Sequence, residues 1–231
     1  ILRNDVYFHD DDIFANGKGR NVVASDFVYS FHRLIDSTVA STGGWLFNDK
    51  VDKKNPFEAL NDTTFIIHLK VPFHPMLGML TLQYCSVVPK EVVAHYGKDF
   101  RAHPVGTGPF KLVRWEENNV LILTKNENYF ERDSSGTKLP YLKGVRISFV
   151  ADRGTEFLQF SQGKLDFITG LDVSYKDKLL SRTGALLPEW KNEIVFEKMP
   201  YLNTEYLGIS MGKQPNEALK NKKVRQAINY A

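Results

Sequence analysis

The residues best suited to acid–base or metal chemistry are six histidines and a short acidic run, and none has the spacing that such chemistry requires. The histidines form no HExxH pattern or other set with metal-ligand spacing. His9 and residues 10–12, all aspartates, could offer oxygen ligands to a hard cation, with a solvated acidic turn as the alternative. A catalytic carboxylate pair assembled only in three dimensions also stays open. We therefore predict no metal site, no cofactor and no catalytic residue.

Motifs for phosphate binding and nucleophilic catalysis are absent as well. The sequence contains no GxxxxGK[ST] loop, no GxGxxG after a strand and no GxSxG elbow. Residues 106–109 (GTGP) come nearest to a glycine-rich loop, but strand-like sequence follows them instead of a helix that could hold a phosphate. The single cysteine, Cys85, lies in an apolar stretch, so we expect a buried, unreactive thiol and no internal disulfide.

Composition is that of an ordinary globular protein. The chain has 231 residues, of which 42% are apolar and 25% charged, and its formal net charge is +3. This excess is too small to indicate a nucleic-acid surface. No window reaches the roughly 18 apolar residues of a membrane span. The length allows one large domain or two small ones.

Hydrophobic periodicity predicts a mixture of helices and strands. We expect helices over 25–36 (with Ser25 as N-cap), 76–82, from 89 onwards, 155–162, 174–180 and 221–231. We expect strands over 6–8, 65–71, 110–115, 120–124, 144–150, 165–168, 194–199 and 206–211, with 37–62 mostly loop. The order strand, helix, strand from Gly144 fits a βαβ unit. Because the helical pattern at the end stops uncapped at Ala231, we expect the chain to be a piece of a longer protein.

An ordered series of short motifs resembles one family, the bacterial extracellular solute-binding proteins of family 5, which bind oligopeptides, dipeptides or nickel for ABC importers. The matching stretches are 2–9, 23–36 (VASDFVYSFHRLID), 87–90 (VVPK), 105–112 with Trp115, 123–129, 163–166 (GKLD) and 224–231 (VRQAINYA). Each motif is weak by itself, but the set in this order is specific and covers nearly the whole chain.

The resemblance implies a fold and a domain division. Family members have two lobes around a cleft, with a type II periplasmic-binding-protein topology. In that frame residues 1–103 resemble a small additional α+β domain, incomplete at its N-terminus. Residues 104–231 resemble the body of the first lobe, and the second lobe would follow Ala231. The expected fold class is therefore mixed α and β, as an incomplete two-lobe protein.

The resemblance also implies which residues line the solute site. Trp45 matches a place where relatives carry an aromatic side chain near the ligand. The loop Thr169, Gly170, Leu171 and Asp172 matches one that lines the cleft, and Tyr206 and Ser210 match a strand at its floor. Ser210 replaces the usual asparagine, which removes an amide donor–acceptor pair. Tyr84 and Tyr201 are further candidate wall residues, although core packing is the ordinary role of aromatic side chains.

The function implied is capture of a peptide or similar solute and its delivery to an ABC permease in the membrane, without catalysis. The resemblance places such a protein in the periplasm or on the cell surface, with a lipid anchor as a further possibility, and as a monomer that does not bind nucleic acid. The alternatives are a peptide-binding chaperone or sensor on the same fold, or a hydrolase domain. Nickel, haem and oligosaccharide carriers share the fold, so the solute class stays open.

Overall fold

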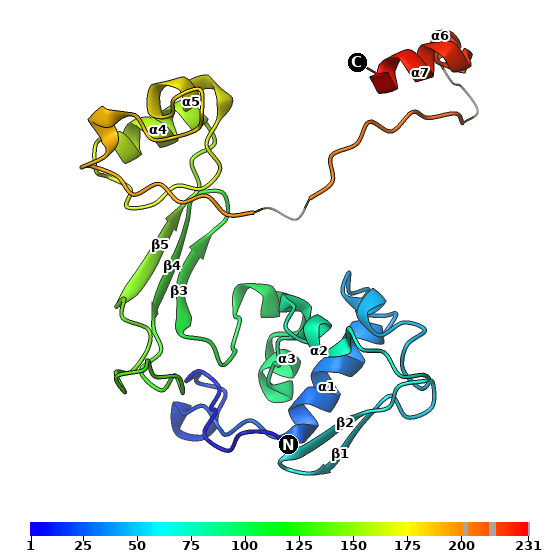
Figure 1. Cartoon of the computed structure of the whole chain (residues 1–231). Helices are drawn as coiled ribbons and strands as arrows, with labels where there is room; N and C mark the ends of the chain where they lie inside the picture. Colours follow the sequence, from blue (N-terminus) through cyan, green and yellow to red (C-terminus); the bar gives the residue numbers. More distant parts are fainter. Residues whose placement is uncertain (201–202, 213–215, 231) are drawn as a thin grey trace. The chain divides into compact units, whose positions relative to one another are not determined.

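The computed structural model describes residues 1–200, 203–212 and 216–230, and the chain forms two compact units, residues 1–166 and 167–231 (Figure 1). Each unit is described by itself. The domain boundary predicted near residue 103 lies inside the first unit and stays a prediction. Tyr201 and Ala231, which the sequence analysis singled out, lie outside the described residues.

The N-terminal half of the first unit is a helix packed on a β-hairpin (Figure 1). Helix α1 (Ala24–Ile35) lies against the antiparallel strands β1 (Phe57–Asn61) and β2 (Thr64–Ile67). Five phenylalanine rings fill the space between them, with neighbouring centroids 5.0–6.4 Å apart: Phe27, Phe31, Phe47, Phe57 and Phe65. Edge-on and tilted ring pairs of this kind add to the free energy of apolar burial.

The predicted elements of this half are partly confirmed. The apolar face of α1 is as predicted, but its N-cap residue is Val23, and the Asp26 carboxylate accepts a hydrogen bond from the Val23 N–H at 2.9 Å. Strand 65–71 is shorter than predicted, and β1 falls in the stretch predicted as loop because Asn, Asp and Pro surround it. The stretch 6–8 makes only the isolated bridge Tyr7–Asn21.

Two short helices complete this half of the unit. Helix α2 (Met76–Met79) ends three residues earlier than predicted, and helix α3 (Lys90–Tyr96) begins after Pro89 as expected. A second core cluster joins α3 to the N-terminal loop through Phe8, Phe14, Val22, Val92 and Val105. The Cys85 thiol is buried, as predicted, in the core cluster that contains the phenylalanine rings between α1 and the hairpin. Burial raises the pKa of this thiol.

A three-stranded antiparallel sheet forms the rest of the first unit, in the order β3 (Phe110–Glu116), β4 (Val120–Lys125) and β5 (Gly144–Ser148). The β3–β4 hairpin confirms the predicted pair of strands. Its register shifts between Leu112 and Arg114, so that Val113 bulges out of the ladder. The bulge brings Leu112 and Trp115, an odd number of residues apart, onto the same face as Leu121 and Leu123 of β4.

The predicted βαβ unit is wrong. Helix α4 (Arg153–Ser161) does follow β5, and the Asp152 carboxylate caps it by accepting from the Thr155 N–H. However, residues 165–168 form no strand, and β5 pairs antiparallel with β4. A stretch of four residues, three of them apolar, is too short for periodicity to distinguish a strand from an extended loop.

The second unit is built around helix α5 (Val173–Leu179), one residue away from its predicted start. The buried residues in the described part of this unit are Tyr175, Leu179 and Leu180. The Trp190 indole N–H donates to the Lys178 carbonyl at 2.9 Å. Helices α6 (Glu217–Lys220) and α7 (Lys222–Tyr230) close the chain. The strands predicted over 194–199 and 206–211 are not formed, since these stretches have no ladder partner among the described residues.

One arginine ties three segments of the first unit together. The Arg20 guanidinium donates to both oxygens of Asp26 (2.8 and 2.7 Å) and to both of Glu91 (2.5 and 3.0 Å), and it lies 5.1 Å from the centre of the Phe8 ring. These carboxylates raise the pKa of Arg20 above its ordinary value. Asp26 is only 3% exposed, so its charge depends on this partner.

We expect Arg20→Met to lower the free energy of unfolding by about 2 kcal/mol, because the buried Asp26 carboxylate would lose its cation. Arg3→Met breaks the exposed Arg3–Asp5 pair and should leave stability unchanged. Urea denaturation of both variants measures the difference. Equal stability of the two variants would contradict a structural role for Arg20.

Candidate functional site

Two buried polar side chains hold the loop 106–109 (GTGP) in place: His9, which precedes the loop in the sequence, and Asn126, which follows it. The His9 backbone N–H donates to the Gly106 carbonyl at 2.8 Å, and His9 Nε2 lies 2.8 Å from the Gly108 carbonyl oxygen. Asn126 Nδ2 donates to the same Gly108 oxygen at 3.0 Å, and the Asn126 N–H donates to Pro109 at 2.8 Å. His9 and Asn126 are 7% and 2% exposed. The loop therefore joins the N-terminal segment to the start of the sheet.

This contact sets the protonation state of His9. Because a carbonyl can only accept, the Nε2 of His9 carries the proton. Burial lowers the pKa of His9, and the hydrogen bond to Gly108 opposes that shift only in part. His9 is thus a neutral donor at pH 7, and its ring is engaged in structure instead of being placed as a general base.

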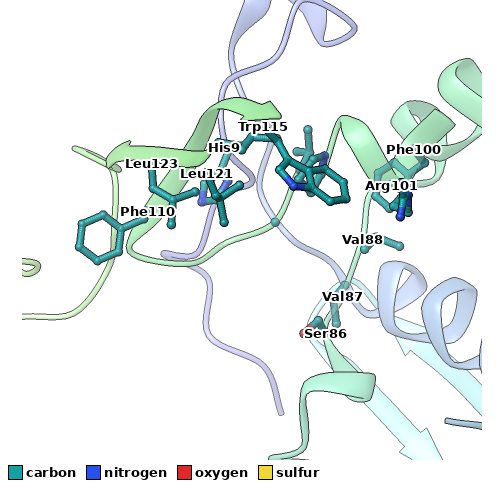
Figure 2. Close-up of a pocket in the computed structure, with 14 residues that line it drawn as sticks. His9, Ser86, Val87, Val88, Phe100, Arg101, Phe110, Trp115, Leu121 and Leu123 are labelled. Atoms are coloured by element: carbon teal, nitrogen blue, oxygen red, sulfur yellow. The ribbon is translucent and has the colours of Figure 1, made fainter. Parts of the chain in front are cut away.

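An apolar cavity of about 460 Å³ lies between the face of the sheet and the segments around residues 86–88 and 100–106 (Figure 2). Its sheet wall consists of Phe110, Leu112, Trp115, Leu121 and Leu123. The two ionisable side chains at the wall are both engaged, His9 with Gly108 and Arg101 with Glu117. The Arg101 guanidinium also lies 4.7 Å from the centre of the Trp115 ring. The cavity can receive apolar groups, and it holds no pair of side chains arranged for catalysis.

Trp45, predicted to face the solute, is half exposed. It lies in a short 3₁₀ turn (Gly44–Leu46), and 52% of its surface is accessible. The Lys50 ammonium donates to the Trp45 carbonyl at 2.8 Å and lies 6.0 Å and 5.9 Å from the ring centres of Trp45 and Phe73. Lys50 thus binds the backbone of Trp45, and the indole itself remains half exposed.

The other six predicted residues lie in the second unit, so they are described separately from Trp45. Thr169 to Asp172 form the loop before α5, in which Gly170 has a left-handed φ of 75°. The Asp172 carboxylate accepts from the Ser174 N–H at 2.8 Å and caps the helix. Tyr206 is 86% exposed and Ser210 is exposed, both in the extended stretch 203–211. The lining of the cavity in the first unit includes none of these six, and their role at the solute site stays a prediction.

The sequence analysis missed the residues that shape the first unit around its cavity. His9 and Asn126 were each quoted within a motif, but no pattern showed that both would bind the Gly108 carbonyl. The available signal was their polarity beside apolar, strand-like sequence, which requires a buried partner. Lys50 and Arg101 gave no such signal, because lysines and arginines in loops are common.

Neither metal ligation nor membrane insertion is indicated in the described part of the chain. There, no group of three or more His, Cys, Asp or Glu side chains is arranged to hold a metal ion. The aspartates after His9 instead order their own loop, Asp10 with Lys18 and the Gly19 N–H, and Asp11 with the Ile13 N–H. In the same residues no helix combines the length and apolarity needed to cross a membrane.

The whole chain, residues 1–231, matches the sequence family described as bacterial extracellular solute-binding proteins, family 5 Middle, and it belongs to that family. It is 29% identical over 174 residues to the glutathione-binding protein GsiB of Escherichia coli O157:H7, which covers 75% of this chain and 31% of GsiB. The chain therefore spans about a third of the length of the relatives it matches.

Solved structures show the same fold. The periplasmic binding protein DppA from Helicobacter pylori, in complex with the peptide STSA, is 26% identical and superposes with a TM-score of 0.65 over 77% of this chain and 36% of DppA. OppA of Burkholderia pseudomallei is 21% identical, with a TM-score of 0.64 over 77% of this chain and 35% of OppA. These likenesses confirm the family and the mixed α and β fold of periplasmic binding proteins.

The neutral state of His9 predicts a pH dependence of stability. Because its folded pKa lies below the unfolded value of about 6.5, its contribution is complete above that pH and is lost as the pH falls through the folded pKa. We expect His9→Gln, which keeps a donor for Gly108, to lose less unfolding free energy between pH 7.5 and 5 than the unmodified protein.

Urea denaturation at the two pH values measures this difference, with His74→Gln, at an exposed histidine, as the matched control. An unchanged pH dependence in His9→Gln, or an equal change in His74→Gln, would contradict the assignment.

Proposed function

We propose that this protein is the solute-binding component of an ABC importer, which captures a peptide or a similar small solute and delivers it to a membrane permease. The observation that supports this most strongly is the match of the entire chain to the family of extracellular solute-binding proteins. The ion-pair and hydrogen-bond networks of the described residues fix loops and helix ends, as a binding scaffold requires, and none is arranged as a nucleophile and base.

The solute would lie in a cleft between two lobes, of which this chain supplies part of one. The proposed contacts are Trp45, Thr169, Gly170, Leu171, Asp172, Tyr206 and Ser210. Exposed aromatic rings would contact side chains of the solute, while backbone groups of the loop before α5 would pair with its amides. The proposed domain division, 1–103 and 104–231, places Trp45 in the small domain and the other six contacts in the lobe.

A peptide is the proposed solute class. DppA, whose structure holds the peptide STSA, is 26% identical to this chain, and GsiB is named as a glutathione-binding protein. MoaA from A. tumefaciens R10, 28% identical with a TM-score of 0.63 over 77% of this chain and 33% of MoaA, was solved with mannopinic acid. A peptide with a free C-terminus and an acid both carry a carboxylate, so we propose small solutes that include an anionic group.

The family description as extracellular supports a periplasmic or cell-surface location for the protein. A lipid anchor and a monomeric state belong to the same proposal. The partner would be the permease of an ABC importer, reached when the closed, solute-loaded form docks on the membrane complex.

Mass spectrometry of the bound solute tests the proposal. The protein is expressed from its complete gene in its own host, purified natively and then denatured to release what it carries. We expect a spread of short peptide masses, because backbone recognition with loosely fitting side-chain pockets tolerates many sequences. A single non-peptide mass would support the binding role but show that the solute is not a peptide. A protein that carries nothing and binds no member of a peptide library would contradict solute capture.

Trp45→Ala tests the proposed wall. Because the indole is half exposed, we expect little change in the free energy of unfolding but at least a tenfold loss of solute affinity. Leu77→Ala, at a side chain 78% exposed on α2, is the matched control and should leave affinity unchanged. Isothermal titration calorimetry with the released solute measures both. Unchanged affinity in Trp45→Ala would remove this residue from the site.

A further inference from the structure

We propose that a second cavity of the first unit, between the C-terminal half of α1 and the turn at residues 83–86, binds an oxyanion the size of a carboxylate or phosphate group. The cavity has a volume of about 250 Å³. Its polar lining residues are Ser30, Arg33, Ser41, Gln83, Tyr84 and Ser86. None of these carries a negative charge, and Arg33 is the one cation.

The guanidinium of Arg33 supplies the charge of the site. Arg33 lies in the last turn of α1, and the Tyr29 ring lies 5.9 Å from its guanidinium carbon. Asp36 interacts with Arg33 through its charge, while its Oδ1 accepts hydrogen bonds from both the N–H and the hydroxyl of Thr38. The five N–H donors of Arg33 therefore meet no hydrogen-bonding acceptor within the described chain.

Neutral donors surround this charge. Ser41 Oγ accepts from the Gly43 N–H at 3.2 Å, which leaves its own proton free to donate. Gln83 is exposed and Tyr84 half-buried, and no hydrogen bond within the described residues engages either side chain. By contrast, Ser30 and Ser86 donate to the carbonyls of Val88 and Gln83, so they serve as structure. A cavity that presents one guanidinium and three free donors is complementary to an oxyanion.

The backbone around the cavity is held in a costly conformation. Ala40, between Val39 and Ser41 of the lining, has a left-handed φ of 51°, which is unusual for a residue with a Cβ. Gly43 lies so close to Tyr84 that an added Cβ would be 2.8 Å from the Tyr84 side chain. Strained backbone of this kind persists only where its surroundings fix it. The loop 37–43 thus packs closely against Tyr84, and Ser41 of this loop lines the cavity.

The oxyanion could come from two sources, a free inorganic anion or the carboxylate of the proposed solute. The chemistry at Arg33 is the same for both. The first source makes the cavity a separate effector site, and the second makes it a subsite that reads the charged end of the solute. This second reading rests on the proposed function, whereas the first does not.

The test uses the protein expressed from its complete gene. Binding of inorganic phosphate is followed by ³¹P line broadening, and binding of a tripeptide is compared with that of its C-terminal amide by calorimetry, all at constant ionic strength. We expect either phosphate binding or a preference for the free acid. We expect Arg33→Met to weaken the effect at least tenfold, Arg33→Lys to restore part of it, and Tyr84→Phe to weaken it a few-fold.

Arg146→Met is the control, because it removes the same charge from an exposed position on β5. Phosphate binding that depends on Arg33 identifies a free anion as the occupant, and an Arg33-dependent preference for the acid identifies the solute carboxylate. Absence of both effects, or an equal loss in Arg146→Met, would overturn the proposal. A tripeptide that binds equally well as acid and amide would leave solute capture intact while it excludes this subsite for the solute.

Discussion

The carbonyl oxygen of Gly108 accepts hydrogen bonds from two buried side chains, His9 and Asn126, and the first unit depends on this shared acceptor. His9 comes from the N-terminal loop that packs on α3, and Asn126 comes directly after β4. A buried carbonyl left without donors would cost about 1–3 kcal/mol. Once both donors are in place, the loop 106–109 has one conformation, and the direction in which β3 leaves the loop is fixed with it.

That shared acceptor links the start of the sheet to the N-terminal segment. The sheet begins at the fixed loop, and the bulge at Val113 then turns Leu112 and Trp115 to one face. On the other side of the loop, Arg20 holds α1 and α3 through two carboxylates. Binding proteins lose affinity when a wall must be ordered during capture, so pre-formed walls serve the proposed function directly.

Local structure followed from the sequence wherever a pattern was long enough. The apolar face of α1 repeats over twelve residues, and the β3–β4 hairpin alternates over two strands around a polar turn, so both were predicted correctly. The stretches 165–168, 194–199 and 206–211 are short, and a strand needs a partner that local sequence does not specify. Likewise, β1 was missed because its five residues lie among turn formers and are stabilised by the phenylalanine cluster.

The candidate site was less predictable than the fold, for a physical reason. Trp45 was predicted through its resemblance to a family position; its ring is half exposed, and its role at the solute site stays a prediction. By contrast, Arg33 comes from α1, and the donors around it come from the loop 37–43 and the turn at 83–86. Whether side chains from separate segments meet at one cavity depends on tertiary packing, and neither residue type nor spacing in the sequence predicts it. Sequence motifs therefore gave the family, while packing determines which side chains are left to bind.

The most direct test of solute capture is a crystal structure of the protein, expressed from its complete gene and purified natively with its solute still bound. The account predicts solute density against the Trp45 ring and the loop 169–172. Density that contacts neither of them, with the solute bound outside any cleft formed by this chain, would contradict it.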